Sequence, residues 1–401
     1  MSPRKASYDK ALSHIHKLLE EQVERTRKIN KPFEWLDYTK VKKLIIGVIG
    51  GDGIGPIIAK EAKRVLNELL KEEILSGKVE IREIEGLTIE NRIKLKKSLP
   101  EFVLAEIRKC HVLLKGPTST PEEGSGLPNI ESANISIRRA FDLFANVRPI
   151  RIPTLGIDWV FFRENTEGEY VLGSSGLMVT PDLALDFKVT TRPGSERITR
   201  LAFEHARKTG RKKVSVVTKA NVVKTTDGLF LETAKMVAKG FPGIGWDSWY
   251  IDVFAAKLID EKRRGEFEVV VLPNLYGDIV TDEAAELQGG VGTAGSANIG
   301  ARFGMFEAIH GSAPRMIAEG RGAYADPLSL MRAAVMMLEH VGKLEKSRKL
   351  GKALDICALF ERKIVMTGRS DGATASQFAN YILSTLADPR LDSRWLAYQK
   401  S

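Results

Sequence analysis

The feature that most constrains the fold is a series of short apolar runs separated by stretches with helical patterning. The runs are VKKLIIGVIG (41–50), CHVLLKG (110–116), DWVFFRE (158–164), KVSVVTK (213–219) and FEVVVLPNL (267–275). Runs that are short and almost wholly apolar are typical of strands buried on both faces, and helices between them cover such strands. We therefore predict an α/β fold with a buried, largely parallel sheet.

Two segments differ from this alternation. Residues 7–28 have the periodicity of an amphipathic helix, with Leu12, Ile15, Leu19 and Val23 on one stripe. We expect this helix to be a docked extension rather than a domain. The stretch 173–196 is rich in small and β-prone residues, and we expect an inserted β arm that pairs with another subunit.

Composition excludes several classes of protein. Of 401 residues, 43% are apolar and 28% are charged, which is ordinary for a folded chain. The net charge is +10, but the lysines and arginines are spread along the whole chain and mixed with acids. We therefore expect them to be solvated surface residues, and we expect no nucleic-acid partner. No apolar run approaches the roughly 20 residues that cross a bilayer, so no membrane partner is expected.

The N-terminus and the cysteines also bear on location. The first residues have no apolar signal core, and they carry too many acids for a typical transit peptide, so we expect a cytoplasmic protein. Cys110 and Cys357 are the only cysteines, and neither lies in a CxxC pair. They are expected to be small core residues rather than a disulfide or zinc ligands.

The motif GGDGIGP at 50–56 resembles the dinucleotide pattern G-x-G-x-x-G, but Pro56 replaces the last glycine. Two interpretations stay open. The glycines either let backbone approach a nucleotide or form a tight turn between a strand and a helix.

Three arginines in the middle of the chain are candidates for binding a substrate. Arg138 and Arg148 lie in SANISIRRAFDLFANVRP (132–149), and Arg163 lies in the next apolar run. Guanidinium groups bind carboxylates in a bidentate manner, so three that converge suit a substrate with several carboxylates. The alternative is that each is an ordinary ion-pair partner.

The segment NLYGDIVTDEAAEL (274–287) places Asp278 and Asp282 four residues apart, on one face of a helix. Two such carboxylates repel unless a cation lies between them, and oxygen ligands suit Mg²⁺ or Mn²⁺. The alternative makes Asp278 a helix N-cap and Asp282 a first-turn acid.

The loop HGSAPRMIAEGRGAYADP (310–327) combines small residues, backbone donors and basic side chains. Such a loop can bind the phosphates of an adenosine nucleotide. The alternative for His310 is a structural histidine.

Taken together, these segments resemble the β-decarboxylating dehydrogenases, the family of the isocitrate, isopropylmalate, homoisocitrate and tartrate dehydrogenases. The resemblance begins near Lys43 and reaches the last helix. It rests on GDGIGP, KGPTSTP, S-x-N-x-x-x-R, NVRP, RENTEGEY, TKAN, NLYGDIVTD and EAIHGSAP, which occur here in that order.

The resemblance implies a two-lobed isocitrate/isopropylmalate dehydrogenase-like fold, which is not a true Rossmann fold, with a β clasp arm. It also implies a homodimer whose subunits share their active sites. The predicted parts are an N-terminal helical extension (1–40), a large domain (41–143 and 290–401), a small domain (144–167 and 198–289) and the clasp-like dimerisation arm (168–197).

The resemblance further assigns roles to individual residues. Tyr170 and Lys219 are the expected proton-transfer residues, with Lys219 supplied by the second subunit. The expected metal ligands are Asp278, Asp282 and, from the second subunit, Asp252. The expected substrate-binding residues are Ser132, Asn134, Arg138, Arg148 and Arg163. The expected cofactor-binding residues are Ser119, Thr120, His310, Gly311, Ser312, Ala313, Pro314, Arg315, Met316 and Asp326.

Substrate and cofactor preferences follow from departures within the family. Ser132 and Asn134 match the isocitrate-type pattern, whereas isopropylmalate enzymes have apolar residues there. NAD enzymes usually carry an acid after HGSAP and bacterial NADP enzymes carry Lys-Tyr, but this chain has Arg315 and Met316. Because arginine suits the 2′-phosphate, we expect NADP to be favoured over NAD. Asp326 replaces the asparagine that usually meets adenine.

The expected activity is therefore the metal-dependent oxidative decarboxylation of isocitrate to 2-oxoglutarate and CO₂. The alternatives are homoisocitrate, tartrate or isopropylmalate as the substrate, or a non-catalytic regulatory subunit. A regulatory subunit would often lack the proton-transfer and metal-binding residues, and all of them are present here.

Overall fold

The computed structural model describes residues 3–31, 34–121, 126–128, 130–173, 175–290 and 292–400. The chain divides into two compact units. Unit 1 comprises residues 1–34 and 144–284, and unit 2 comprises residues 35–143 and 285–401. Each unit combines a mixed sheet with helices, as expected of an α/β chain.

Unit 2 has a sheet whose strands lie in the order β2 (Val79–Glu83), β1 (Leu44–Ile49), β3 (Val112–Lys115), β12 (Gly304–Ala308) and β11 (Gly295–Ile299). All neighbours in it are parallel except β11 and β12, which are antiparallel. Its helices are α2 (Gly55–Leu69), α3 (Lys71–Leu75), α4 (Ile89–Leu95), α5 (Glu101–Ile107), α6 (Ala133–Ala140), α11 (Pro314–Ala318), α12 (Leu328–His340), α13 (Leu344–Asp355), α14 (Ala375–Ala387) and α15 (Leu391–Lys400).

The core of unit 2 forms where helices cover this sheet. Leu113 of β3 and Met305 of β12 pack with Val103 and Ile107 of α5 and with Ile137 of α6. Helix α12 lies against β3, β11 and β12. The two cysteines, Cys110 and Cys357, are both buried with free thiols, as predicted.

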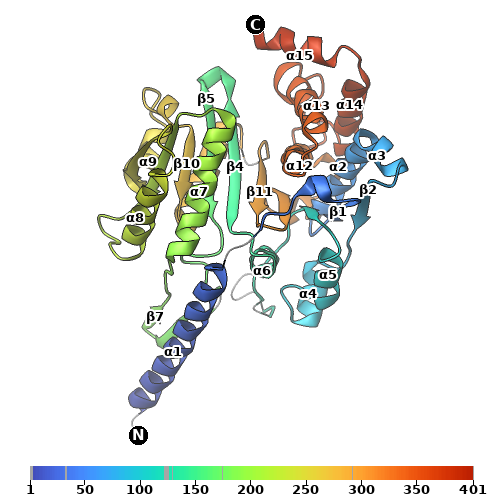
Figure 1. The fold of residues 1–401 in the computed structure, drawn as a ribbon. Helices are drawn as coiled ribbons and strands as arrows, with labels where there is room; N and C mark the ends of the chain where they lie inside the picture. Colours follow the sequence, from blue (N-terminus) through green and yellow to red (C-terminus); the bar gives the residue numbers. More distant parts are fainter. Residues whose placement is uncertain are drawn as a thin grey trace. The chain divides into compact units, whose positions relative to one another are not determined.

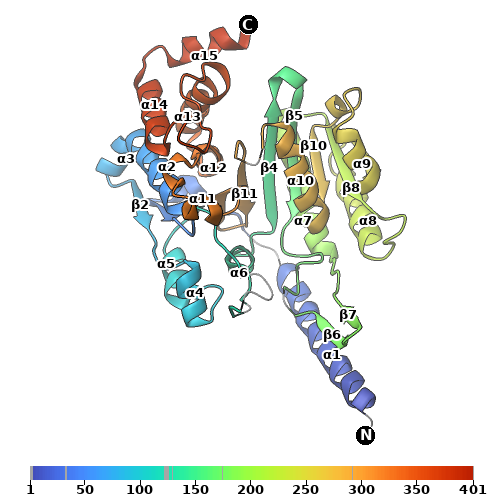
Figure 2. The same cartoon turned by 180° about the vertical axis from the view of Figure 1, so that it is seen from behind.

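Unit 1 has strands in the order β4 (Ala145–Ile152), β5 (Ile157–Glu164), β10 (Val269–Leu272), β8 (Lys213–Thr218) and β9 (Gly245–Tyr250). Only β4 and β5 are antiparallel in this series. The helices are α1 (Pro3–Ile29), α7 (Arg192–Thr209), α8 (Thr226–Ala238), α9 (Ile251–Leu258) and α10 (Asn274–Leu287). Helix α7 covers one face of this sheet and α10 the other (Figures 1 and 2).

A hairpin of β6 (Leu177–Thr180) and β7 (Leu183–Leu185) forms the β arm expected from the sequence. Figure 2 shows this hairpin beside α1. The range predicted for the arm, 168–197, extends too far, because its last residues belong to helix α7, which begins at Arg192. The Thr191 side chain accepts a hydrogen bond from the Gly194 backbone and so caps that helix.

The N-terminal helix α1 docks on unit 1, but not through the predicted stripe. Leu12, Leu19 and Val23 are 63%, 60% and 52% exposed, whereas Ala11 and Leu18 are buried. The apolar side of α1 is wide, and the chain covers only the part centred on Ala11 and Leu18. Leu12, Leu19 and Val23 therefore lie outside the surface through which α1 contacts the rest of the chain. No helix in the described part of the chain is long and apolar enough to cross a membrane.

Candidate functional site

The glycine motif that follows β1 is a tightly packed turn. A Cβ on Gly51 would lie 2.1 Å from the carbonyl oxygen of Pro117, and one on Gly53 would lie 1.9 Å from that of Ser312. Both glycines also have positive φ angles, of 76° and 57°. The turn therefore needs glycine in order to pack against two neighbouring loops, which favours the strand–helix turn over the dinucleotide interpretation.

Asp52, inside this turn, organises the loop after β3. Its carboxylate accepts hydrogen bonds from the backbone N–H groups of Ser119 and Ile89, each at 2.7 Å. The fully buried Arg92 donates to the carbonyl oxygen of Ser119 at 2.6 Å. A buried acid and a buried arginine thus fix the backbone at Ser119, while Thr120 is exposed.

The expected cofactor residues of two loops meet in unit 2. Strands β3 and β12 are parallel neighbours, so the loops that follow them leave the same edge of the sheet. The hydroxyl oxygens of Ser119 and Ser312 are 2.7 Å apart there. Nδ1 of His310 lies 3.0 Å from the Gly311 carbonyl oxygen, and burial lowers the pKa of this histidine.

The next part of this loop leads into α11. Ala313 has φ 47°, and α11 begins at Pro314. Arg315 is 86% exposed, and its Nε donates to Glu319 at 2.6 Å, while Met316 is half-buried.

Asp326 lies beyond α11 and is held by the start of α12. Its carboxylate accepts a hydrogen bond from the Leu328 backbone at 2.9 Å. Burial raises the pKa of Asp326 to about 6. The carboxyl group is therefore partly engaged with its own chain at the position where the family usually has an asparagine.

The expected substrate residues of α6 lie close to other polar groups of unit 2. Ser132 precedes the helix, and Asn134 accepts a hydrogen bond from the Thr118 hydroxyl at 3.4 Å. Arg138 forms an ion pair with the buried Glu307 at 3.2 Å. The three residues are thus placed by α6, and the charge of Arg138 is balanced within the unit.

Lys115 was not singled out from the sequence, although it is the one charged residue in the run CHVLLKG. It pairs with Glu307 in the register of β3 and β12, and its Nζ lies 3.9 Å from the Glu307 carboxylate. Burial lowers the pKa of Lys115 to about 8, although the Glu307 charge opposes this effect. A lysine at the end of a wholly buried strand is the signal that could have identified it.

In unit 1, strand pairing places Arg148 and Arg163 on one face. Asn146 lies opposite Arg163 and Arg148 lies opposite Phe161, so both arginines point to the same side of the β4–β5 pair. Arg163 donates to the Asp278 carboxylate, and Arg148 Nη2 lies 3.6 Å from it. These two predicted substrate arginines therefore do converge.

The two predicted metal ligands of α10 lie under these arginines. Arg148 donates to Asp282 at 2.6 Å and to the Thr281 hydroxyl at 2.6 Å. Because α10 begins at Asn274, Asp278 lies in its second turn. The alternative that Asp278 is an N-cap is therefore wrong, and both aspartates present oxygen atoms to one cluster of cations.

Tyr170 joins the same cluster from the loop after β5. Its hydroxyl donates to the second oxygen of Asp278 at 3.2 Å. Burial raises the pKa of Tyr170, and the Asp278 charge raises it further. Gly277 of α10 leaves room for the Arg163 side chain in this cluster, since a Cβ on Gly277 would lie 2.6 Å from Cγ of Arg163.

Asn274 is a second residue that sequence reasoning missed. Its Oδ1 accepts hydrogen bonds from Arg163 Nε and Nη2 at 3.0 and 2.6 Å. Its Nδ2 donates to the carbonyl oxygen of Glu167 at 2.8 Å. It therefore fixes the orientation of Arg163, and its place at the head of NLYGDIVTD was the available signal.

Lys219 and Asp252 form a separate pair in unit 1. Thr218 and Tyr250 are aligned in the parallel pair of β8 and β9, so the residues that follow leave the same edge. Lys219 Nζ lies 2.5 Å from Asp252, and this hydrogen bond lowers the pKa of Asp252. Among the described residues, no group of three or more His, Cys, Asp or Glu side chains is placed to hold a metal. In the described part of the chain, Asp252 therefore does not form a cluster with Asp278 and Asp282.

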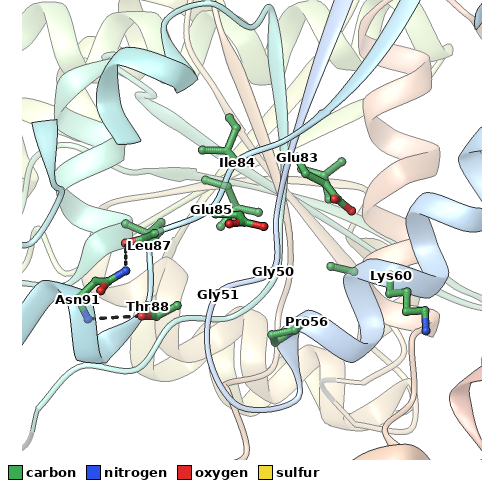
Figure 3. Close-up of a pocket in the computed structure, with 14 residues that line it drawn as sticks. Gly50, Gly51, Pro56, Lys60, Glu83, Ile84, Glu85, Leu87, Thr88 and Asn91 are labelled. Atoms are coloured by element: carbon green, nitrogen blue, oxygen red, sulfur yellow. Dashed lines mark hydrogen bonds between the residues drawn. The ribbon is translucent and has the colours of Figure 1, made fainter. Parts of the chain in front are cut away.

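A cavity of about 440 Å³ lies in unit 2 beside β1 and the segment after β2. Figure 3 shows Glu83 and Glu85 on one side of it, Gly50, Gly51 and Pro56 along the turn, and Lys60 at its edge. Gly50, Gly51 and Pro56 of the glycine motif line this cavity, but none of the predicted substrate-binding, metal-binding or cofactor-binding residues does. It is therefore separate from the serine pair of the two loops.

The comparisons with known proteins give the family. Residues 45–367 match the family model described as isocitrate/isopropylmalate dehydrogenase. The chain belongs to this family. Membership supports β-decarboxylating dehydrogenase activity with a nicotinamide cofactor and a divalent metal.

Individual relatives differ in substrate. The chain is 37% identical to a homoisocitrate dehydrogenase of Methanocaldococcus jannaschii, over 84% of this chain and 98% of that protein. It is 38% identical to subunit 2 of the mitochondrial NAD isocitrate dehydrogenase of Schizosaccharomyces pombe, over 77% of this chain and 79% of that one. The crystal structure of an isocitrate dehydrogenase from Methylococcus capsulatus matches with a TM-score of 0.74 and 33% identity, over 86% of this chain and 100% of that one.

Proposed function

We propose that this chain catalyses the metal-dependent oxidative decarboxylation of isocitrate to 2-oxoglutarate and CO₂, with NADP favoured over NAD. The observation that carries the proposal is the convergence of Arg148 and Arg163 on Asp278 and Asp282. This cluster holds cations for substrate carboxylates and oxygen ligands for a metal side by side.

The choice of isocitrate rests on α6. Ser132 and Asn134 offer a hydroxyl and an amide where an isopropylmalate enzyme would have apolar residues. Burying these groups against an isopropyl group would leave them unpaired, at a cost of about 1–3 kcal/mol each. Arg138 supplies a cation on the same helix, and Lys115 adds a second one to the charge cluster around Glu307.

The residues present fit a divalent metal. Asp278 and Asp282 offer carboxylate oxygens that pair with Arg148 and Arg163 and accept a hydrogen bond from Tyr170, and Asp252 of a second copy would complete the set. A bound Mg²⁺ or Mn²⁺ would supply Lewis-acid stabilisation of negative charge on the substrate oxygens. Arg148 would then bind a substrate carboxylate next to the two aspartates.

Proton transfer is assigned to two side chains. Lys219 of the second copy would assist the removal of the hydroxyl proton of the substrate. Tyr170 would protonate the carbon that loses CO₂, because a phenol is protonated at neutral pH and can donate its proton at that step. The arginines hold the carboxylates and leave the acid–base chemistry to these two groups.

For the cofactor, Ser119, Thr120 and the loop from His310 to Met316 would bind the nicotinamide nucleotide. Arg315 supports NADP, because its guanidinium can bond the 2′-phosphate. Glu319 opposes this preference, since it accepts a hydrogen bond from Arg315 and also pairs with Arg321. We therefore propose a preference for NADP that is smaller than an unpaired arginine would give.

A homodimer with shared active sites forms part of the proposal, because Lys219 and Asp252 pair with each other rather than with Asp278. Mixing two inactive variants, Lys219→Met and Asp278→Asn, tests this point directly. If the sites are shared, subunit exchange should restore part of the activity, because some sites then receive both native residues. If each subunit works alone, the mixture should stay inactive.

Homoisocitrate is the second candidate substrate, because the homoisocitrate dehydrogenase relative is matched over 98% of its length. The experiment is a spectrophotometric assay of NADP and NAD reduction with isocitrate, homoisocitrate, tartrate and 3-isopropylmalate in the presence of Mg²⁺ or Mn²⁺. Isocitrate should have the highest kcat/KM. A higher value for another acid would overturn the substrate assignment, and no turnover with any acid would favour the regulatory-subunit alternative.

A further inference from the structure

The N-terminal helix α1 precedes the part of the chain that matches the family model, which starts at residue 45. We propose that α1 is a positioning element for the active-site loop that carries Tyr170, and that it acts through Arg25. This inference rests on the proposed function for the roles of Tyr170 and Arg163.

Arg25 reaches from α1 into the loop after β5. Its Nη1 lies 3.1 Å from the Glu167 carboxylate, and its Nη2 donates to the Thr166 hydroxyl at 3.2 Å. Glu167 is 3% exposed and Arg25 is 23% exposed, so the pair is largely removed from water. A pair at this depth is much less screened than a surface ion pair, and loss of either partner leaves a buried charge.

Glu167 connects Arg25 to the predicted substrate arginine. Its carboxylate also accepts hydrogen bonds from the backbone and hydroxyl of Thr191, at 2.8 and 2.5 Å. Its carbonyl oxygen accepts from Asn274, which in turn holds Arg163. The position of Glu167 is therefore transmitted to Arg163 and, three residues along the chain, to Tyr170.

A second buried carboxylate makes the Arg25 cation more important. Glu164 accepts hydrogen bonds from the Thr166 and Glu167 backbone N–H groups. Burial and the adjacent charge of Glu167 raise its pKa, and Arg197 opposes this effect. Without Arg25, Glu164 and Glu167 would have fewer cations nearby. The loop would then have to expand, or one of the two carboxylates would have to take up a proton.

Other contacts on the same face of α1 hold the chain beyond Tyr170. His14 Nε2 lies 3.0 Å from the Ser175 carbonyl oxygen, and Leu18 packs with Val171 and Leu172. Residues 14, 18 and 25 fall on one side of a helix with 3.6 residues per turn. Helix α1 thus contacts the loop both before and after Tyr170, and this arrangement restricts the loop more than a single contact would.

The first test replaces Arg25 in the full-length protein. Arg25→Met should lower kcat roughly 10- to 100-fold, because small displacements of catalytic groups have effects of that size. The KM for the cofactor should change little. Hydrogen exchange of residues 164–172 should be faster, while exchange in β8 and β10 stays unchanged. Arg25→Lys should restore part of the activity.

The matched control is Arg27→Met, since Arg27 lies on the exposed side of α1 and pairs with Glu24 of the same helix. Leu18→Asn releases α1 through a different contact and should reproduce the lower kcat and the faster exchange. The proposal is overturned if Arg25→Met and Leu18→Asn behave like Arg27→Met. It is equally overturned if exchange accelerates throughout unit 1, since α1 would then only stabilise the fold.

The two proposals fail in different ways. A parent protein without turnover on any 2-hydroxy acid would contradict the proposed function. The exchange rates of residues 164–172 in the parent and in Arg25→Met test the role of α1 without any assay of activity.

Discussion

The guanidinium of Arg148 donates to the carboxylate of Asp282 at 2.6 Å, from strand β4 to helix α10. The same side chain lies 3.6 Å from Asp278, one helical turn earlier. One arginine therefore bridges the two carboxylates that would otherwise repel each other. Under the proposed function, a divalent cation bound by these carboxylates would weaken their attraction for Arg148, and Arg148 would then be available to bind a substrate carboxylate.

The first prediction concerns Asp278 as a metal ligand. Asp278→Asn should abolish turnover and also lower the melting temperature, because the buried Arg163 keeps a hydrogen-bond acceptor but loses its counter-charge. Kinetics over a range of Mg²⁺ and Mn²⁺ concentrations, together with thermal melts, measure both effects. Glu345→Gln, an exposed acid in α13 of unit 2, is the control. Near-normal activity of Asp278→Asn with unchanged magnesium dependence would show that Asp278 is not a ligand.

The second prediction concerns the choice of substrate by α6. Replacing both Ser132 and Asn134 with leucine should reduce kcat/KM for isocitrate by roughly 100-fold or more, since two hydrogen bonds to a charged carboxylate are worth about 1.5–3 kcal/mol each. The measurement is kcat/KM for isocitrate and for 3-isopropylmalate in parent and variant. An unchanged value for isocitrate would mean that these residues do not face the substrate.

Much of the fold could be predicted because its strands are local features of the sequence. Runs such as KVSVVTK and FEVVVLPNL became β8 and β10, since an apolar segment of that length has few other ways to be buried. The convergence of Arg148 and Arg163 was predicted only because guanidinium groups suit a substrate with several carboxylates. Their shared face depends on the register of β4 and β5, which no local pattern contains.

The residues that sequence reasoning missed act through long-range contacts. Asn274 matters because its amide lies between Glu167 and Arg163, and Lys115 matters because β12 places Glu307 opposite it. The docking face of α1 is a similar case. Periodicity gives the apolar side of a helix, but not which part of that side the rest of the chain covers.

The third prediction is a pH dependence of stability that arises from Glu361, near the C-terminus. Burial alone would raise its pKa, but hydrogen bonds from Lys363, Arg394, Tyr381 and Tyr398 outweigh this effect and lower the pKa to about 2, from an ordinary 4.5. A depressed carboxyl pKa stabilises the folded state above the unfolded value. That stabilisation should be complete above pH 4.5 and be lost as the pH falls towards 2.

Glu361→Gln tests this directly. At neutral pH the variant should be less stable than the parent by about 1–3 kcal/mol, since a charged acceptor of several hydrogen bonds is lost. The difference should shrink as the pH falls below 4.5, because the parent then takes up a proton at this site. Urea unfolding at a series of pH values measures it, with the exposed Glu345→Gln as the control. A difference that does not depend on pH would rule out this role for the carboxylate charge.

The last prediction concerns the cofactor and follows from the competition for Arg315. One charged hydrogen bond to the 2′-phosphate of NADP is worth about 1.5–3 kcal/mol, or roughly 10- to 150-fold in kcat/KM over NAD. Glu319 lies 2.6 Å from Arg315 Nε and reduces the positive charge at this position, so the parent should fall near the lower end of that range. Arg315→Asp should shift the ratio of kcat/KM values towards NAD, since an acid repels the phosphate and can accept hydrogen bonds from the ribose hydroxyls. Glu319→Gln should shift it in the opposite direction, because it removes the competing charge and keeps a side chain of the same size. The measurement is the ratio of kcat/KM with NADP to kcat/KM with NAD, at low ionic strength, for the parent and the two variants. The two variants should shift this ratio in opposite directions. A parent that favours NAD, or ratios that neither variant moves, would show that Arg315 does not select the cofactor.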